Sequence, residues 1–469
     1  MDVDAFDYDL IILGSGPGGE GAAMQAAKTS SKVAVIDAHS AVGGNCTHVA
    51  TIPSKALRQV AHQLVSFETD PICGKYFDRS QVRFSDLLFN AKKVIEKQVS
   101  MRTSHYIRNG VDLFCGRGRF IDAHTISIDQ EDGQKTTLRA KHFVIATGAR
   151  PYIPGALELD SERVFSSDTV LALEHLPRTI TVYGAGVVGC EYTCIFRSLG
   201  RKVNLINSEA RLLDFLDNEI SEALSYHLRD NGVLIRNGEA LEKVEKVEDG
   251  VIVHCRSGKK IKSDILLYTC GRQGNSNNLG LEDLGIEIDR RGAIVVNEHY
   301  QTTAPHIYAV GDVTGFPSLA SAAYDQGRFA SRHIKDNHCD NKLIKDIPVG
   351  IYTSPEISCV GKTEKDLTEA NIPYEIGHAS FRHLAKAQIS GQTVGMLKIL
   401  FHAHTLEILG VHCFGHNASE IIHIGQVVML QPAPQNTLRY FIDTTFNYPT
   451  MAEAYRVAAL NGLNRVWKA

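Results

Sequence analysis

The sequence lacks the marks of a nucleic-acid-binding, secreted or membrane-spanning protein. It has no long basic run, and 49 Lys and Arg residues against 53 Asp and Glu residues give a formal net charge of −4. This balance argues against nucleic acid as a partner. No apolar run approaches the roughly 18 residues that span a bilayer. Residues 1–7 are acidic and have no apolar core, so we expect no signal peptide and no membrane contact.

Cysteine pairs are also missing. The ten cysteines are scattered without a C-x2-C pair, apart from Cys190 and Cys194, whose spacing is that of one face of a helix. A zinc framework or a secreted disulfide scaffold would show closely spaced pairs. We therefore expect no metal site, thiols that are mostly small buried residues, and a reducing, cytoplasmic compartment.

Two Gly-rich turns are present instead, and the first follows residues 9–13. Gly14, Gly16 and Gly19 fit G-x-G-x-x-G, an Ala-rich helical stretch runs to about residue 28, and a second apolar run, 32–36, ends at Asp37. Such glycines let the backbone approach a pyrophosphate at a helix N-terminus, and the acid can bind a ribose 2′-hydroxyl. The motif alone is often a simple turn, but strand, helix, strand and acid together favour a dinucleotide site.

The same pattern repeats in the middle of the chain. Gly184, Gly186 and Gly189 follow residues 180–183, a helix is expected to about residue 199, and the run 202–206 leads to Asn207. The repeat predicts two dinucleotide sites in a chain of 469 residues, for which roughly three domains of about 150 residues are expected. One cofactor would stay bound while the other exchanges.

The two ribose positions differ in charge. Asp37 lies 23 residues after Gly14, and Asn207 lies 23 residues after Gly184, with Arg211 four residues further on. A carboxylate would repel a 2′-phosphate, and a close pair of arginines would demand one. The neutral amide does neither, so the second site is predicted to accept both NAD(H) and NADP(H). Asn207 as a plain turn residue is the alternative.

Residues 43–57, GGNCTHVATIPSKAL, resemble the active-site segment of the flavoprotein disulfide reductases, such as lipoamide dehydrogenase and glutathione reductase. That family carries a C-x4-C redox disulfide beside a flavin. Here Cys46 holds the first position and Thr51 the second. If the segment is helical, Thr51 and Lys55 share one face, and the resemblance implies that Lys55 faces the flavin. A surface lysine is the alternative.

The resemblance extends along the chain and implies an α/β fold with two Rossmann-like dinucleotide-binding domains, for FAD and NAD(P), and a C-terminal α+β dimerisation domain. The expected boundaries are 1–152 and 273–346 for the FAD-binding domain, 153–272 for the NAD(P)-binding domain and 347–469 for the dimerisation domain. The dimerisation domain implies a homodimer or a larger homo-oligomer. The FAD-binding positions that match the family are Gly14, Gly16, Gly19, Asp37, Gly44, Lys55, Thr147, Gly148 and Asp312. The nicotinamide-nucleotide positions are Gly184, Gly186, Gly189, Asn207, Arg211 and Gly271.

A second departure from the family lies near the C-terminus. Its disulfide reductases carry H-P-T-x-x-E, where the histidine is the acid/base for the thiol. Here Pro449, Thr450 and Glu453 remain, but Tyr448 replaces the histidine. Tyrosine, with an ordinary pKa of about 10, is a poor base at neutral pH. The resolving cysteine and the base are therefore missing together.

Without a disulfide, the expected acceptor for flavin-borne hydride is a second nicotinamide. The runs C-T-H-x-x-T-I-P-S-K-A-L and F-N-Y-P-T-M-A-E resemble those of the flavin-dependent pyridine nucleotide transhydrogenases, a branch of the same family. The resemblance implies the reaction NADPH + NAD+ = NADP+ + NADH, of the Si-specific type, with ping-pong kinetics through FAD.

Three residues are expected at the reaction centre. The resemblance implies that Lys55 pairs with Glu191 beside the flavin, while an ordinary first-turn acid is the alternative for Glu191. Cys46 is either a packing residue or a single-thiol centre that cycles through a sulfenic acid. Two rival functions remain open: a lipoamide dehydrogenase-like reductase that uses a cysteine from elsewhere, and an idle flavoprotein scaffold.

Overall fold

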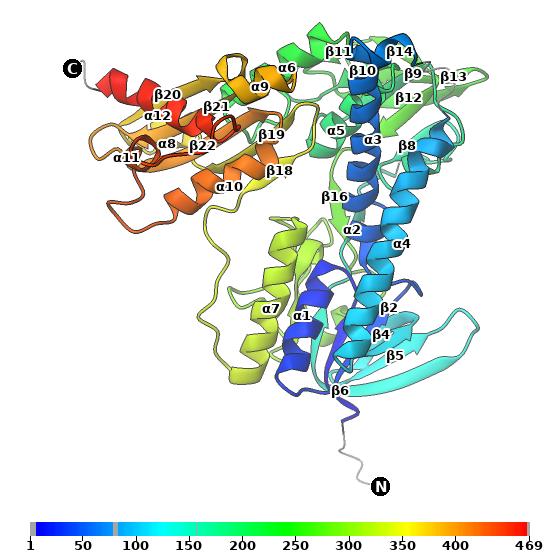
Figure 1. Cartoon of the computed structure of the whole chain (residues 1–469). Coiled ribbons are helices and arrows are strands. Elements are labelled where there is room, and N and C mark those ends of the chain that lie inside the picture. The colour runs from blue at the N-terminus through cyan, green and yellow to red at the C-terminus, as the bar shows by residue number, and fades with distance from the viewer. Residues whose placement is uncertain (1–5, 78–82, 156, 467–469) are drawn as a thin grey trace.

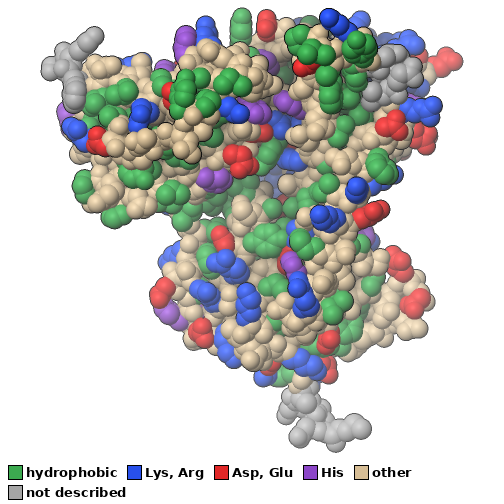
Figure 2. All heavy atoms as spheres, in the orientation of Figure 1, with side chains coloured by type: hydrophobic (Ala, Val, Ile, Leu, Met, Phe, Trp, Pro, Cys, Tyr) green, Lys and Arg blue, Asp and Glu red, His purple; other side chains and the backbone are tan. Residues whose placement is uncertain are grey.

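A computed structural model of the chain describes residues 6–77, 83–155 and 157–466, so the acidic residues 1–5 lie outside it. Figure 1 shows three lobes. The lower lobe holds the N-terminal strands together with α1 (Pro17–Lys28) and α7 (Ala320–Asp336), and the two upper lobes hold the middle and the C-terminal part of the chain. The surface is hollowed where the lower lobe meets the upper two (Figure 2).

The lower lobe is built on a sheet in the order β3-β2-β1-β6-β5-β4, with β17 paired to β6. Its strands are β1 (Tyr8–Leu13), β2 (Val33–Asp37), β3 (Asp112–Cys115), β4 (Arg117–Asp122), β5 (Thr125–Asp129), β6 (Lys135–Ile145) and β17 (Ile307–Ala309). β3, β2, β1, β6 and β17 are parallel, while β4, β5 and β6 pair antiparallel. The parallel part has the strand order of a dinucleotide-binding fold.

Close helix packing unites the two sequence segments of this lobe. α1 and α7 cross so tightly that a Cβ on Gly327 would lie 2.1 Å from the Gly18 carbonyl oxygen. Two further helices, α3 (Thr51–Thr69) and α4 (Phe84–Arg108), run upward from it (Figure 1). α3 meets the condition on which Thr51 and Lys55 were expected to share one face, because both residues lie in this helix, four positions apart.

The middle lobe repeats the parallel arrangement. Its five-stranded sheet has the order β11-β10-β9-β15-β8, and a separate antiparallel sheet, β12-β13-β14, covers one end. The strands are β8 (Val164–Ser166), β9 (Thr179–Tyr183), β10 (Lys202–Ile206), β11 (Leu234–Arg236), β12 (Leu241–Val247), β13 (Gly250–Cys255), β14 (Lys260–Ser263) and β15 (Ile265–Tyr268). α5 (Val187–Ser198) and α6 (Asn218–Asp230) complete it. Two dinucleotide-binding sheets are thus present.

The C-terminal lobe is an antiparallel sheet in the order β18-β19-β22-β21-β20, covered by helices. The strands are β18 (Val349–Ile351), β19 (Glu356–Gly361), β20 (Tyr374–Ser380), β21 (Gly395–His402) and β22 (Ile408–Gly415). The helices are α8 (Glu364–Glu369), α9 (Ala385–Ile389), α10 (Ala418–Met429), α11 (Arg439–Asp443) and α12 (Glu453–Val466). This is the expected α+β region, and its core holds Phe401, Phe441 and Tyr455.

Two short strands, β7 (Ala149–Pro151) and β16 (Arg272–Gly274), pair where the chain passes between the lower and middle lobes. α2 (Gly44–His48) precedes α3. In the described part of the chain no helix is long and apolar enough to cross a membrane. The expectation of mostly buried thiols holds for five of the ten cysteines, because Cys73 and Cys115 are exposed and three are partly buried.

Candidate functional site

The first Gly-rich turn joins β1 to α1. Gly14 has φ +103°, and a Cβ there would lie 2.3 Å from the Ala146 carbonyl oxygen, so the turn requires glycine. A Cβ on Gly19 would lie 1.9 Å from the Gly14 carbonyl oxygen. Gly16 precedes the helix, which leaves the first N–H groups of α1 without a side-chain cap. These N–H groups form the positive end that a pyrophosphate favours.

Asp37 is held next to this turn. Its Oδ2 accepts hydrogen bonds from the Ser15 backbone N at 2.8 Å and from the Ser15 hydroxyl, and its Oδ1 accepts from the His39 backbone N at 3.0 Å. The Ser15 hydroxyl in turn accepts from the Gly43 backbone N at 3.0 Å. The predicted ribose-binding acid is therefore oriented by the same loop that carries the glycines.

A cavity of about 1190 Å³ brings many of the predicted residues together. It is lined by Gly14, Gly16, Asp37, Gly44, Cys46, Lys55, Thr147, Gly148, Glu191 and Asp312. It is not lined by Gly19, Gly184, Gly186, Gly189, Asn207, Arg211 or Gly271. The cavity thus runs from the first Gly-rich turn to α5, the helix of the second.

The residues of this cavity fit a flavin dinucleotide. Gly44 has φ +58°, and a Cβ there would lie 2.8 Å from the Gly16 Cα, so two glycine backbones pack closely at the wall of the cavity. A Cβ on Gly148 would contact none of the described atoms within 4 Å. Burial raises the pKa of the Asp312 carboxyl at the far end, while Arg272 opposes the shift. α7 also begins at the cavity, with Ala320 in its lining.

Lys55 and Glu191 form an ion pair at the junction of the two dinucleotide sites. The Lys55 Nζ lies 2.6 Å from the Glu191 Oε2, with the two side chains 27% and 6% exposed. The Glu191 Oε1 accepts a hydrogen bond from the Tyr352 backbone N at 2.9 Å. The Tyr352 ring centroid lies 5.0 Å from the Lys55 Nζ, which adds a cation–π contact. The predicted pairing is therefore present, and three lobes contribute to it.

Cys46 lies on α2 as a free, partly buried thiol. Its pKa is raised by burial, while a hydrogen bond with the Thr51 hydroxyl lowers it in part. Because the thiolate is the reactive form, a raised pKa leaves this sulfur mostly protonated at neutral pH. Thr51 thus occupies the place of a resolving thiol with a group that has no redox chemistry.

The second Gly-rich turn has the geometry of the first. Gly184 has φ +108°, and a Cβ on Gly189 would lie 1.8 Å from the Gly184 carbonyl oxygen. Gly186 precedes α5, whose first N–H groups are free of a side-chain cap. Val187, Val188, Glu191 and Tyr192 of this helix line the large cavity. The second site therefore opens onto the first.

Asn207 and Arg211 lie beside this second turn, but their side chains are engaged. The buried Asn207 amide donates from Nδ2 to the carbonyl oxygens of Glu209 at 3.1 Å and Arg211 at 2.7 Å. The Arg211 guanidinium pairs with Asp214 at 3.1 Å. The Asn207 amide thus stabilises its own loop by hydrogen bonds, which is the role of a turn residue that was the alternative interpretation of Asn207.

Tyr448 lies away from the cavity in the single chain. Tyr448 is 71% exposed, and the peptide bond that joins it to Pro449 is cis. A phenol is a poor base at neutral pH. The structure therefore agrees with the absence of thiol acid/base chemistry.

Several residues that the sequence did not point to also reach the site. The cavity is lined by Arg272, Gly350, Tyr352, Ser419, Ile422 and His423. Beneath the first turn, the buried Glu20 pairs with Arg102, and the Tyr324 hydroxyl donates to it at 2.6 Å. These partners come from distant helices with no local motif, and the one sequence signal was the charge of Glu20 inside an Ala-rich helix.

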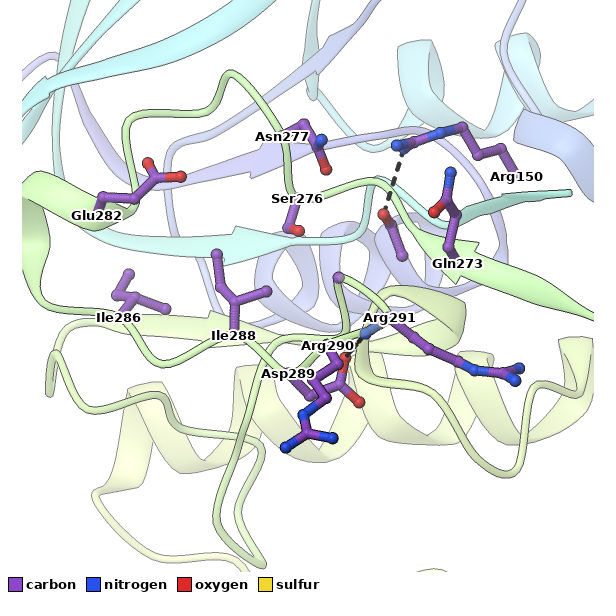
Figure 3. Close-up of a pocket in the computed structure, with 12 residues that line it drawn as sticks. Arg150, Gln273, Ser276, Asn277, Glu282, Ile286, Ile288, Asp289, Arg290 and Arg291 are labelled. Atoms are coloured by element: carbon purple, nitrogen blue, oxygen red, sulfur yellow. Dashed lines mark hydrogen bonds between the residues drawn. The ribbon is translucent and has the colours of Figure 1, made fainter. Parts of the chain in front are cut away.

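A second cavity, of about 520 Å³, lies next to the paired strands β7 and β16, which supply part of its lining (Figure 3). Arg150, Arg290 and Arg291 line it together with Glu282 and Asp289. Arg150 donates from Nη1 to the Asn275 Oδ1 at 2.9 Å, and Asp289 accepts from the Arg291 backbone N at 2.8 Å. Because charges of both signs line this cavity, it favours no single class of ligand.

Comparison with known families matches nearly the whole chain. Residues 8–327 match the family described as pyridine nucleotide-disulphide oxidoreductase, and residues 347–459 match the dimerisation domain of that family. The LpdA protein of Mycobacterium tuberculosis has a similar structure, with a TM-score of 0.88 at 27% identity, covering 96% of this chain and 98% of that one. The HOCl-induced flavoprotein disulfide reductase RclA of Escherichia coli has a TM-score of 0.86 at 25% identity, covering 97% and 99%.

Relatives of higher sequence identity carry another name. Proteins named soluble pyridine nucleotide transhydrogenase are 57% identical in Vibrio parahaemolyticus, over 98% of this chain and 99% of the relative. Those of Colwellia psychrerythraea are 57% identical over 99% of each chain. Those of Serratia proteamaculans are 56% identical over 98% and 99%.

Proposed function

Because the chain belongs to the pyridine nucleotide-disulphide oxidoreductase family, we propose that it transfers hydride between nicotinamide nucleotides, NADPH + NAD+ = NADP+ + NADH. FAD and a nicotinamide nucleotide are the cofactors that the family implies. The finer assignments, use of both NAD(H) and NADP(H) and the Si-specific type, belong to this proposal. Relatives at 56–57% identity over nearly the full length support it by their name.

One observation carries the proposal. The thiol of Cys46 has the hydroxyl of Thr51 as its partner where a disulfide reductase needs a second thiol, while the Lys55–Glu191 pair and both Gly-rich turns are intact. The chain thus keeps the groups for binding two dinucleotides and lacks those for reducing a disulfide. A lipoamide dehydrogenase-like activity has no comparable support.

The residues of the chain have separate roles in this scheme. The uncapped N-termini of α1 and α5 would bind the pyrophosphates, and Asp37 would bind the adenosine ribose of FAD. When bound, FAD would supply the redox chemistry of hydride transfer. Lys55, held by Glu191 and Tyr352, would supply a positive charge that stabilises the negative charge of the reduced flavin. Gly350 and Tyr352 help to enclose the cavity and limit water.

We also propose domain boundaries at residues 152, 272 and 346, and a homo-oligomer of at least two chains. Cytoplasmic localisation stays a prediction. The dimerisation-domain match supports the homo-oligomer. In a dimer the exposed Tyr448 segment becomes available to a neighbouring chain.

The test is hydride transfer from NADPH to thio-NAD+, followed by absorbance on the FAD-loaded protein without added thiol. Parallel lines in double-reciprocal plots are expected, because each nucleotide leaves before the next one enters. Lipoamide, oxidised glutathione and mercuric ion serve as acceptors for the rival reductase. Turnover with any of them in place of thio-NAD+ would reject the proposal, and the absence of all turnover would leave the scaffold function.

Replacing Cys46 with serine is expected to leave the rate of transhydrogenation within about two-fold of the wild type. The raised pKa of the thiol and the hydroxyl partner at Thr51 both indicate that the sulfur takes no part in hydride transfer. The steady-state rate with NADPH and thio-NAD+ measures this, and Cys73→Ser, at an exposed thiol, is the matched control. Loss of activity in the Cys46 variant alone would favour the single-thiol mechanism.

A further inference from the structure

The loop between β10 and α6 carries an ion pair at the ribose end of the second site. Arg211 donates from Nε and Nη2 to the Asp214 Oδ1 at 3.2 and 3.1 Å, and from Nη1 to the Asn218 side-chain oxygen. The side chains of Arg211 and Asp214 are 36% and 57% exposed. The guanidinium of Arg211 is thus paired with a carboxylate, Asp214, that is exposed to solvent.

The side chain of Asn207 is not free to distinguish NADP(H) from NAD(H). Its amide donors are engaged by the carbonyl oxygens of Glu209 and Arg211, and its side chain is buried. The charge that a 2′-phosphate meets must come from the neighbouring cations. Discrimination between NADP(H) and NAD(H) therefore depends on the loop that follows Asn207.

Three cations lie on or pair with the segments that are hydrogen-bonded to Asn207, and they differ in their partners. Lys259 pairs with Glu239, a buried carboxylate that also accepts a hydrogen bond from Ser257. Arg236 donates from Nη1 to the Asn204 side-chain oxygen at 3.1 Å. Arg211 alone among these three is paired with an exposed carboxylate. An exposed ion pair contributes little and exchanges readily, so Arg211 is the cation that a ligand can recruit.

We propose that Asp214 determines nucleotide specificity by competing with the 2′-phosphate for Arg211. This inference rests on the proposed use of both nucleotides at the second site. With NAD(H), Arg211 stays on Asp214 and no charge is left unpaired. With NADP(H), the 2′-phosphate takes the guanidinium through charge-assisted hydrogen bonds and must first displace Asp214. The competition narrows the difference between the two affinities, which suits a site that both nucleotides visit in turn.

Direct binding of NADP+ and of NAD+ to the FAD-loaded protein, by titration calorimetry, tests this without turnover. In Asp214→Asn the Kd for NADP+ is expected to fall about two- to five-fold, the fold-change that corresponds to an exposed ion pair. The Kd for NAD+ is expected to stay unchanged. Arg211→Gln should raise the Kd for NADP+ by about ten-fold or more, again without an effect on NAD+.

The double variant Arg211→Gln/Asp214→Asn identifies the mechanism. If Asp214 acts through Arg211, the asparagine substitution has no effect once the arginine is gone. Asp249→Asn is the matched control, because Asp249 is an exposed partner of Lys262 in the same lobe and its loss changes the charge equally. At about 1 M salt, where screening acts within about 3 Å, the gain for Asp214→Asn should disappear.

Each outcome separates this inference from the proposed function. Equal shifts for NADP+ and NAD+, or no shift for either, would overturn the role of Asp214 even if transhydrogenation is observed. A selective shift would support that role even if no hydride reached thio-NAD+, and the proposed function would then fail by itself. A shift in Asp249→Asn of the same size would reduce the effect to net charge.

Discussion

Replacing Lys55 with methionine is expected to slow the reduction of bound flavin by NADPH about a hundred-fold, the effect of removing one charge-stabilising donor from an active site. Methionine keeps an unbranched side chain of similar length but removes the charge that lies 2.6 Å from the Glu191 Oε2. The buried Glu191 then keeps the Tyr352 backbone N–H as its partner, without a counter-charge. Both changes disfavour extra negative charge at this point of the cavity.

Anaerobic stopped-flow absorbance measures the rate of flavin reduction, and the midpoint potential of the bound flavin gives a second readout. We expect a lower potential in Lys55→Met, because the oxidised ring loses less from the missing charge than the reduced one. Lys141→Met is the matched control, since Lys141 pairs with Asp9 on the exposed surface of the lower lobe. Wild-type rate and potential in Lys55→Met, at full flavin content, would remove Lys55 from the reaction centre.

The second large effect concerns stability. Lys398→Met is expected to lower the free energy of unfolding by about 3–5 kcal/mol, the range for breaking a buried ion pair from one side. Lys398 is 0% exposed, and its Nζ lies 2.7 Å from the Asp217 Oδ1 and 3.0 Å from the Glu219 Oε2. It also pairs with Glu364. Its loss leaves the carboxylate of Asp217, which is 1% exposed and caps the N-terminus of α6, without its lysine counter-charge.

Urea unfolding, followed by circular dichroism, measures the change. Lys246→Met is the control, because Lys246 also has two carboxylate partners, Glu158 and Asp160, but is partly exposed. Its loss should change the free energy of unfolding by about 0–1 kcal/mol. Equal midpoints for Lys398→Met and the wild type would show that the cluster adds no stability.

The ion-pair cluster of Lys398 with Asp217, Glu219 and Glu364 also makes the free energy of unfolding depend on pH in the acid range. His378 and then Lys398 lower the pKa of Glu219 from 4.5 to about 2. A carboxyl whose folded pKa is lowered adds stability above its unfolded pKa and loses it as the pH falls toward the folded value. We therefore expect this contribution to be present at pH 5 and above and to disappear between about pH 4.5 and pH 2. In Lys398→Met the loss over this window should be smaller.

Features of short sequence range could be predicted from the residues alone. The two Gly-rich turns follow from glycine spacing, because at φ +103° or +108° an added Cβ would lie within 3 Å of a carbonyl oxygen. The spacing of Thr51 and Lys55 is that of one helix face, and both residues lie in α3. The missing thiol and the missing histidine were read directly from Thr51 and Tyr448.

Other parts of the site were decided only by the tertiary structure. Tyr352 is 161 residues from Glu191, and nothing in the sequence linked it to the site. The Lys55–Glu191 pair was expected only from the family resemblance, because the two residues are 136 apart and no local pattern joins them. The amide of Asn207 could be seen in the sequence, but not that two carbonyl oxygens already hold it. Asp214 and Lys398 looked like ordinary charged residues. Their roles depend on burial and on which charges face each other, and both arise only when distant segments pack together.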